Sequence, residues 1–127
     1  MRRGVRRFVV ACTMAAAVVA GCQPINRNPP PQVRAGDPAA GAQDIAHFGC
    51  GGCHVVPGVQ GADGTVGPPL NGFARRQFIA GQVTNNPAHL IHWLRFPTEI
   101  DPGTDMPNLG ITQAQARDIA AYLYTLD

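Results

Sequence analysis

The chain has 127 residues, ten basic residues and eight acids, which gives a formal net charge of +2 at pH 7. This length suits one small domain with a single hydrophobic core. All the basic residues are arginine, and four of them fall within the first seven positions, so residues 22–127 keep six arginines against eight acids, a net charge of −2. This balance excludes the clustered basic face of a nucleic-acid-binding protein.

The N-terminal segment has the pattern of a secretion signal. An arginine-rich start, Met1–Arg7, precedes the apolar run Phe8–Ala20, whose 13 residues are too few for a membrane-spanning helix. The segment Val19–Cys22 is similar to the cleavage box of bacterial lipoproteins. We therefore expect residues 1–21 to be a lipoprotein-type signal peptide and Cys22 to be acylated, which predicts an exported protein anchored at the periplasmic face of a membrane. The alternative is an ordinary cleavage site followed by an incidental cysteine.

A polar, proline-rich segment follows the predicted cleavage site. It contains the triple proline Pro29–Pro31, which favours an extended chain. At about 3.1 Å per residue, such a segment reaches roughly 40 Å. We expect residues 22–36 to be a tether that begins at the lipidated cysteine, and residues 37–127 to be the folded domain.

The first helix is expected to begin after Asp37, which can cap it, with Pro38 at the first helical position. It should end near Gly49. Gly41 lowers helix stability and indicates close approach by another helix. The next segment, Val55–Arg76, has no helical period and is rich in glycine and proline, which predicts a loop wrapped around something.

A middle helix is predicted over Pro87–Phe96, because Asn86 can cap it and Pro97 should end it. Phe78–Val83 is expected to add at most a short turn. The last helix should follow a capping box formed by Thr112 and Gln115. Its apolar stripe recurs at helical spacing: Ala116, Ile119, Ala120, Leu123 and, one turn on, Leu126. No strand pattern of useful length occurs, so we expect an all-α domain with much loop.

The motif Cys50-Gly51-Gly52-Cys53-His54 has the spacing of c-type haem attachment. Two thiols at this spacing can each bond a vinyl group of one haem, and the following histidine can bind the iron as proximal ligand. A Cys-x-x-Cys redox pair or half of a zinc site is the alternative. A redox pair does not need His54, and a zinc ribbon needs a second cysteine pair.

Met106 is the candidate for the sixth ligand of the iron. It is the only methionine left once the signal is removed, and it lies in a loop bounded by Pro102 and Pro107, where it would gain little as a core residue. Three histidines compete with it: His47, His89 and His92. We expect them to face away from the iron or towards solvent.

At this point the chain resembles class I cytochrome c, the small monohaem electron carriers. The resemblance covers about residues 37–127 and rests on four segments in the family's order: Cys50–His54, Gly67–Leu70, Pro97–Met106 and Ala121–Leu123. It implies thioether bonds from Cys50 and Cys53 to one haem c. It also implies the cytochrome c fold, with three main helices and long loops wrapped around the haem.

The resemblance further implies roles around the haem. The Pro68 carbonyl would accept a hydrogen bond from the far nitrogen of His54, which raises the donor strength of the imidazole. Leu70 would press on the haem face, and Trp93 would lie on its methionine side. Arg76 would lie near a propionate, although Arg75 could serve instead.

The first and last helices would cross as the resemblance implies. The expected contacts of this crossing come from two helices: Gly41 and Phe48 in the first, and Ile119, Tyr122 and Leu123 in the last. The lysine-rich docking faces of some family members are absent, because the chain contains no lysine. We therefore expect a largely apolar docking surface.

The predicted function is transfer of single electrons rather than catalysis, because a histidine and a methionine together fill both axial positions of the iron. The expected partners are a quinol-oxidising or dehydrogenase donor and a terminal oxidase acceptor in a bacterial respiratory chain. The alternative is a haem subunit of a dehydrogenase or oxidase complex, or a peroxidase-like or gas-binding haem protein with a labile sixth ligand.

Overall fold

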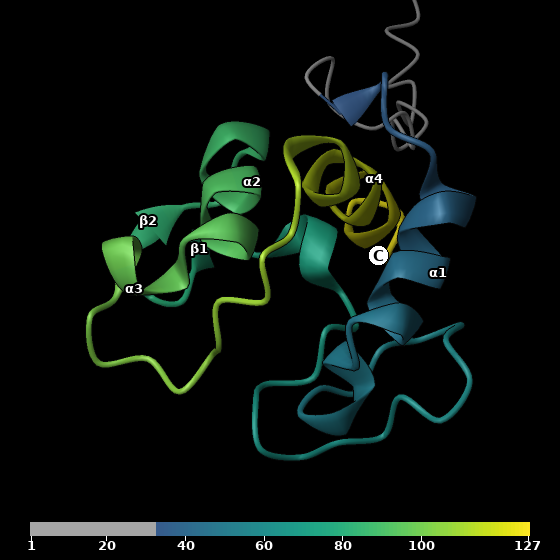
Figure 1. Ribbon diagram of the computed structural model, residues 1–127, viewed down its shortest axis with the longest axis horizontal. Helices are drawn as coiled ribbons and strands as arrows, with labels where there is room; N and C mark the ends of the chain where they lie inside the picture. Colours follow the sequence, from purple (N-terminus) through teal and green to yellow (C-terminus); the bar gives the residue numbers. More distant parts are fainter. Residues whose placement is uncertain (1–32) are drawn as a thin grey trace, which may run out of the picture.

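The computed structural model describes residues 33–127 (Figure 1). The expected signal peptide, Cys22 and the tether up to residue 32 lie outside the described residues. The elements follow in the order α1 (Pro38–His47), η2 (Cys50–Gly52), η3 (Phe73–Arg75), β1 (Phe78–Ile79), β2 (Val83–Thr84), α2 (Pro87–Arg95), α3 (Pro97–Ile100) and α4 (Gln113–Leu123). Figure 1 shows α1, α2 and α4 above two long loops, one after η2 and one between α3 and α4.

Helix α1 begins where its capping residue predicts. Asp37 has an extended backbone, and its carboxylate accepts a hydrogen bond from the Ala39 amide at 2.8 Å. Pro38 fits at the first helical position, because no intrahelical partner exists for an amide there. The helix ends at His47, and Gly49 adopts a left-handed conformation with φ of 70° that only glycine takes without strain.

The contact of α1 with α4 depends on Gly41, as predicted from its unfavourable place in a helix. Gly41 is buried, and a Cβ atom built on it would overlap the Asp118 carbonyl oxygen of α4. The two helix backbones can therefore approach at this point only because the side chain is missing. Ile45 of α1 and Ile119 of α4, each 1% exposed, belong to the core of the domain.

Helix α4 confirms the predicted capping box. Thr112 Oγ1 accepts a hydrogen bond from the Gln115 amide at 3.3 Å, and Gln115 Oε1 accepts one from the Thr112 amide at 3.1 Å. Four residues of the predicted apolar stripe are buried: Ala116, Ile119, Ala120 and Leu123. The fifth, Leu126, lies beyond the end of the helix and is half-buried. Helical spacing in the sequence therefore predicted which face of the helix packs against the core.

Helix α2 begins at its predicted cap, since Asn86 Oδ1 accepts a hydrogen bond from the His89 amide at 2.9 Å. It ends at Arg95, one residue before the prediction. The prediction missed α3, which Pro97 starts directly after α2 ends. A proline that stops one helix is also a favourable first residue for the next.

The expectation that the domain contains no strand was wrong for one short pair. β1 and β2 form an antiparallel pair in which Phe78 faces Thr84 and Ile79 faces Val83. Strands of two residues are too short to show the alternation by which strands are recognised in a sequence. The part of the chain that the structure describes contains no helix long and apolar enough to cross a membrane.

Candidate functional site

The cysteine–histidine motif lies in the tight turn that follows α1. The Cys53 and His54 amides both donate to the Cys50 carbonyl, at 3.2 and 3.0 Å. A Cβ atom at Gly51 would lie 2.6 Å from the Ala62 Cα atom, whereas one at Gly52 would meet nothing within 4 Å. Close packing thus accounts for the first glycine of the motif and leaves the second unconstrained.

The long loop after the motif is tied back to it by three backbone hydrogen bonds. The Gly64 amide donates to Gly51, the Gly67 amide to Cys53 and the Leu70 amide to Val55, at 2.9, 2.8 and 2.8 Å. The predicted loop is therefore present as an ordered wall beside the motif. This wall carries the residues that contact the imidazole of His54.

His54 is held by Gly67 and Pro68. Its Nδ1 atom lies 2.7 Å from the Pro68 carbonyl oxygen. A carbonyl can only accept, so Nδ1 donates, and in the neutral imidazole Nε2 then carries the free lone pair. This is the tautomer that a histidine needs to bind a metal through Nε2.

The glycine before Pro68 has a role that the sequence analysis did not assign. A Cβ atom at Gly67 would overlap Cε1 of His54 and lie 2.7 Å from its Nδ1 atom and 2.9 Å from its Nε2 atom. The imidazole can therefore lie against the backbone only where no side chain is present. A glycine directly before the proline pair was the available signal, but its contact with His54 depends on how the loop folds back.

A cavity of about 490 Å³ lies next to this motif, within the range of roughly 300–1,000 Å³ typical of cofactor sites. All eight residues predicted for the haem site line it: Cys50, Cys53, His54, Pro68, Leu70, Arg76, Trp93 and Met106. Side chains of the hydrophobic core also line it, among them Ile45, Leu90, Ile119 and Leu123. The cavity is thus an opening into the core itself.

Met106 reaches the cavity from the loop between α3 and α4. Its amide donates to Thr104 Oγ1 at 3.1 Å. Asp101 shapes the start of the same loop, because its carboxylate accepts from the Gly103 amide and its carbonyl accepts from the Thr104 amide, both at 3.1 Å. These bonds hold a half-buried thioether at the cavity instead of on a free loop.

The structure distinguishes between Arg76 and Arg75, the two arginines that the sequence analysis named for the contact with a propionate. Arg76 lines the cavity, donates to the carbonyl oxygens of Pro69 and Asn71, and lies over the Phe73 ring at 5.6 Å. Arg75 is exposed and does not line the cavity. Arg76 is therefore the arginine placed to meet an acidic group of a bound cofactor.

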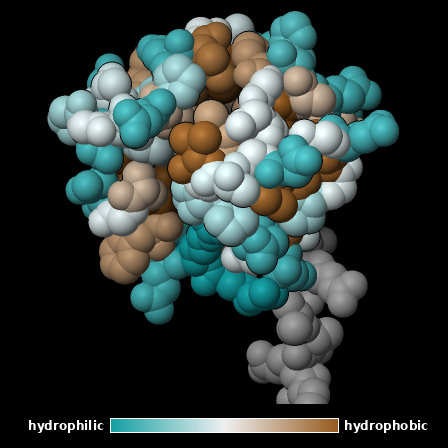
Figure 2. All heavy atoms as spheres, turned by 90° about the horizontal axis from the view of Figure 1, so that it is seen from below, coloured by the Kyte–Doolittle hydropathy of each residue, from teal (hydrophilic) through white to brown (hydrophobic). Residues whose placement is uncertain are grey.

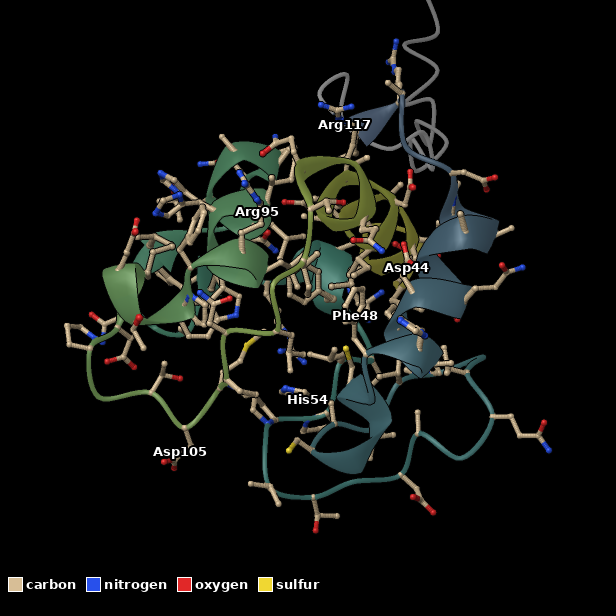
Figure 3. The ribbon with its side chains drawn as sticks, viewed as in Figure 1. Asp44, Phe48, His54, Arg95, Asp105 and Arg117 are labelled. Atoms are coloured by element: carbon tan, nitrogen blue, oxygen red, sulfur yellow. The ribbon has the colours of Figure 1, made fainter. Side chains whose placement is uncertain are left out.

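The competing histidines do not line the cavity. The His47 ring packs edge-on against Phe48, His89 Nδ1 lies 2.8 Å from the Thr84 carbonyl oxygen, and His92 pairs with Glu99 at 2.9 Å. Figure 3 shows His54 facing the centre of the molecule, between the two lower loops.

The environment of the thiols bears on the redox and zinc alternatives. Burial raises the pKa of the Cys50 thiol, whereas a disulfide-exchanging thiol needs a lowered pKa. Cys50 and Cys53 are not joined by a disulfide bond. Among residues 33–127, no group of three or more His, Cys, Asp or Glu side chains could hold a metal ion.

Comparison with known proteins identifies the family. The family model for cytochrome c matches residues 39–127. The chain belongs to the cytochrome c family. Membership implies covalently bound haem c with its iron and points to an electron carrier rather than an enzyme. It also confirms the expected fold class, a mostly helical cytochrome c domain.

Two relatives have similar sequences. Cytochrome c from Tetrahymena pyriformis is 33% identical over 111 residues, which cover 76% of this chain and 95% of that protein. Cytochrome c oxidase subunit 2 from Bacillus sp. (strain PS3) is 33% identical over 95 residues, which cover 71% of this chain. This chain spans only 27% of the length of the Bacillus protein.

The cavity fits the cofactor that cytochrome c membership implies. Two thiols and the His54 imidazole lie at one wall, a thioether lines the same cavity, and most of the other lining residues are apolar. This donor set matches haem ligation and thioether attachment.

Proposed function

We propose that this chain is a class I, monohaem electron carrier. Cys50 and Cys53 would form the thioether bonds, and His54 and Met106 would be the axial ligands. The observation that carries the proposal is one cavity lined by both thiols, by the His54 imidazole and by the only methionine of the described residues. When bound, haem supplies an iron that takes up and releases one electron.

The protein's own groups would set the properties of that iron. The hydrogen bond from His54 Nδ1 to Pro68 fixes the ring and increases the donor strength of Nε2. A thioether ligand from Met106 would raise the reduction potential and occupy the second position offered to a ligand by the iron. With both positions filled, no site is left for a substrate, which favours a carrier over a peroxidase-like or gas-binding protein.

Other lining residues would hold the porphyrin. Leu70 and Trp93 are half-buried and offer apolar contact to its faces. Arg76 offers a cation for a propionate, and its hydrogen bonds to backbone carbonyls orient the guanidinium without neutralising it. A desolvated carboxylate next to an oriented arginine gains a charge-assisted hydrogen bond.

Redox partners would dock at the mouth of the cavity. The large apolar side chains that the described residues leave exposed are Val66, Phe78 and Leu109, and all three line the cavity. Figure 2 views the molecule from the side of the two lower loops and shows apolar residues on this face among polar ones. Such a face supports a transient, largely apolar contact with a respiratory donor and acceptor.

A second candidate function is a haem subunit of a larger redox complex. The similarity to a cytochrome c oxidase subunit favours it. Purification from native membranes at moderate salt distinguishes the two, because a carrier should separate from its partners whereas a subunit should co-purify in fixed proportion.

We further propose that the domain is exported and held at the periplasmic face of a membrane through lipidated Cys22. The support is the arginine-rich start, the short apolar run and the cleavage box. Tethering would raise the effective concentration of the carrier at membrane-bound partners. Wild-type protein should fractionate with membranes, and Cys22→Ala should stall processing or release the domain. Unmodified, soluble wild-type protein would remove the anchor from the proposal and leave the haem assignment untouched.

The axial methionine offers the sharpest test of the carrier proposal. Oxidised wild-type protein should show the methionine–iron absorption band that the family resemblance implies. Met106→Ala should abolish this band, lower the reduction potential and allow small ligands to bind the iron. Leu109→Ala, in the same loop and also at the cavity, is the matched control and should keep the band. An unchanged spectrum and potential in Met106→Ala would mean that another residue is the ligand.

A further inference from the structure

A second, separate groove lies between α2 and α4. Its volume is about 380 Å³, and it is lined by Ala88, Ile91, His92, Arg95, Gln113 and Arg117. None of these residues lines the larger cavity. Figure 3 shows Arg95 and Arg117 in the upper half of the molecule, on the side away from His54 and Asp105.

Helical spacing explains why two arginines share this groove. On α2, Ala88, Ile91 and Arg95 recur at intervals of three and four residues, so they share one face. On α4, Gln113 and Arg117 are four residues apart and also share a face. The packing of α2 against α4 brings these two faces together.

The Arg95 guanidinium is oriented by uncharged groups. Its Nη1 atom donates to Gln113 Oε1 at 2.7 Å, its Nε atom donates to the Ile111 carbonyl at 3.4 Å, and it stacks over the Phe96 ring at 4.6 Å. These contacts fix the direction of its remaining N–H groups. Because no partner is an anion, the positive charge stays uncompensated.

The Arg117 guanidinium is paired with no carboxylate, carbonyl or ring among residues 33–127. Two carboxylates have other partners: Asp118, the next residue in sequence, and Glu99, which pairs with the groove residue His92. Asp118 accepts a hydrogen bond from the Asp37 amide at 2.8 Å, and Glu99 pairs with His92 at 2.9 Å. No carboxylate lines the groove.

This concentration of positive charge contrasts with the rest of the domain. Residues 33–127 contain five arginines and eight acids, and two of those arginines line a groove that no acid lines. Oriented guanidinium groups bind phosphate through paired, charge-assisted hydrogen bonds. We propose that the groove between α2 and α4 binds an anion that carries a phosphate group.

The phosphate could belong to a free phosphorylated molecule or to a phospholipid headgroup. The start of the domain bears on the second source, because Gly36 lies directly against α4, where a Cβ atom would meet the Arg117 carbonyl oxygen. Gly36 therefore lies beside the helix that carries Arg117. If Cys22 is lipidated, the domain is held close to a membrane, where phospholipid headgroups are available.

The first arm of the test uses free phosphate. Full-length, haem-loaded, reduced protein is titrated with inorganic phosphate at constant ionic strength, and amide NMR shifts of α2 and α4 are followed. We expect saturable shifts in the wild type. Arg117→Gln should weaken binding by about tenfold or more, as expected for losing a charge-assisted hydrogen bond. Arg75→Gln removes an exposed arginine outside the groove and should bind like the wild type.

The second arm uses vesicles and full-length protein with Cys22→Ser, which removes the acylation site. Binding to phosphatidylglycerol vesicles but not to phosphatidylcholine vesicles, lost in Arg117→Gln and kept in Arg75→Gln, would assign the headgroup as the source. Saturable binding of inorganic phosphate without vesicle binding would assign a free phosphorylated molecule. The proposal is overturned if neither arm gives saturable binding, or if Arg75→Gln weakens binding as much as Arg117→Gln.

Discussion

Gly67→Ala should weaken the protein through one residue, His54. The added methyl group would overlap the imidazole, because Cε1, Nδ1 and Nε2 all lie within 3 Å of the built Cβ position. Overpacking of this kind costs about 1–3 kcal/mol. Displacing the ring also breaks its 2.7 Å hydrogen bond to Pro68, which contributes about 0.5–1.5 kcal/mol. We therefore expect a loss of about 2–4 kcal/mol in the free energy of unfolding.

Urea unfolding of the haem-loaded protein measures this loss. With a slope of about 2 kcal/mol per M for a domain of this size, the midpoint should fall by roughly 1–2 M. The reduction potential should rise, since an imidazole without its Pro68 partner is a weaker donor and stabilises oxidised iron less. Gly52→Ala is the matched control, because its Cβ atom would meet nothing within 4 Å and its φ is not positive. Equal midpoints for the two variants would refute the steric role of Gly67.

Three further predictions concern attachment, alkaline stability and docking. Denatured protein treated with acidified acetone should keep its colour through Cys50 and Cys53, and the double variant Cys50→Ala/Cys53→Ala should lose haem together with its helical circular dichroism. Burial raises the pKa of Tyr124 to about 12, whereas an exposed tyrosine titrates near 10. The stabilisation from this shift is complete below about pH 10 and is lost as the pH rises towards 12. Tyr124→Phe lacks the titrating group, so its urea midpoint should fall less between pH 10 and pH 12 than that of the wild type. Electron transfer to the native acceptor should depend weakly on ionic strength, and a steep fall between low and physiological salt would contradict an apolar docking face.

The elements that the sequence predicted well are those with local signals. Asp37, Asn86 and the pair of Thr112 with Gln115 each use a side chain to bond an amide within three residues, so the start of each helix can be read directly from the chain. The β1–β2 pair and α3 escaped prediction because strands of two residues show no alternation and Pro97 marks both an end and a start.

The candidate site likewise contains residues that local sequence signals identified and residues that only the fold brings together. The motif from Cys50 to His54 is local, and Met106 was the one methionine available beyond the signal, so both could be named from the sequence. The family resemblance favoured Arg76 over Arg75, and the path of the loop agrees, because only Arg76 lines the cavity. Arg95 and Arg117 line one groove because of how α2 packs on α4, which no local pattern encodes.

Helix α2 separates the two sites of the molecule. Leu90, Trp93 and Leu94 line the larger cavity, whereas Ile91 and Arg95 line the groove on the other side. A bound phosphate group would therefore sit on the opposite face of the helix that carries Trp93. Partner docking at the cavity and anion binding at the groove can then occur together.

The larger cavity also indicates how much a bound cofactor would contribute to the stability of so small a chain. An apolar core forfeits about 24 cal/mol for each Å³ that its own side chains leave unfilled. For the cavity of about 490 Å³ this amounts to roughly 12 kcal/mol, an upper bound because the cavity is open to solvent. That is as large as the whole stability of a typical domain, about 5–15 kcal/mol. Ile45, Leu90 and Ile119 belong to the core and also line the cavity, so a haem bound there would complete the core that positions it.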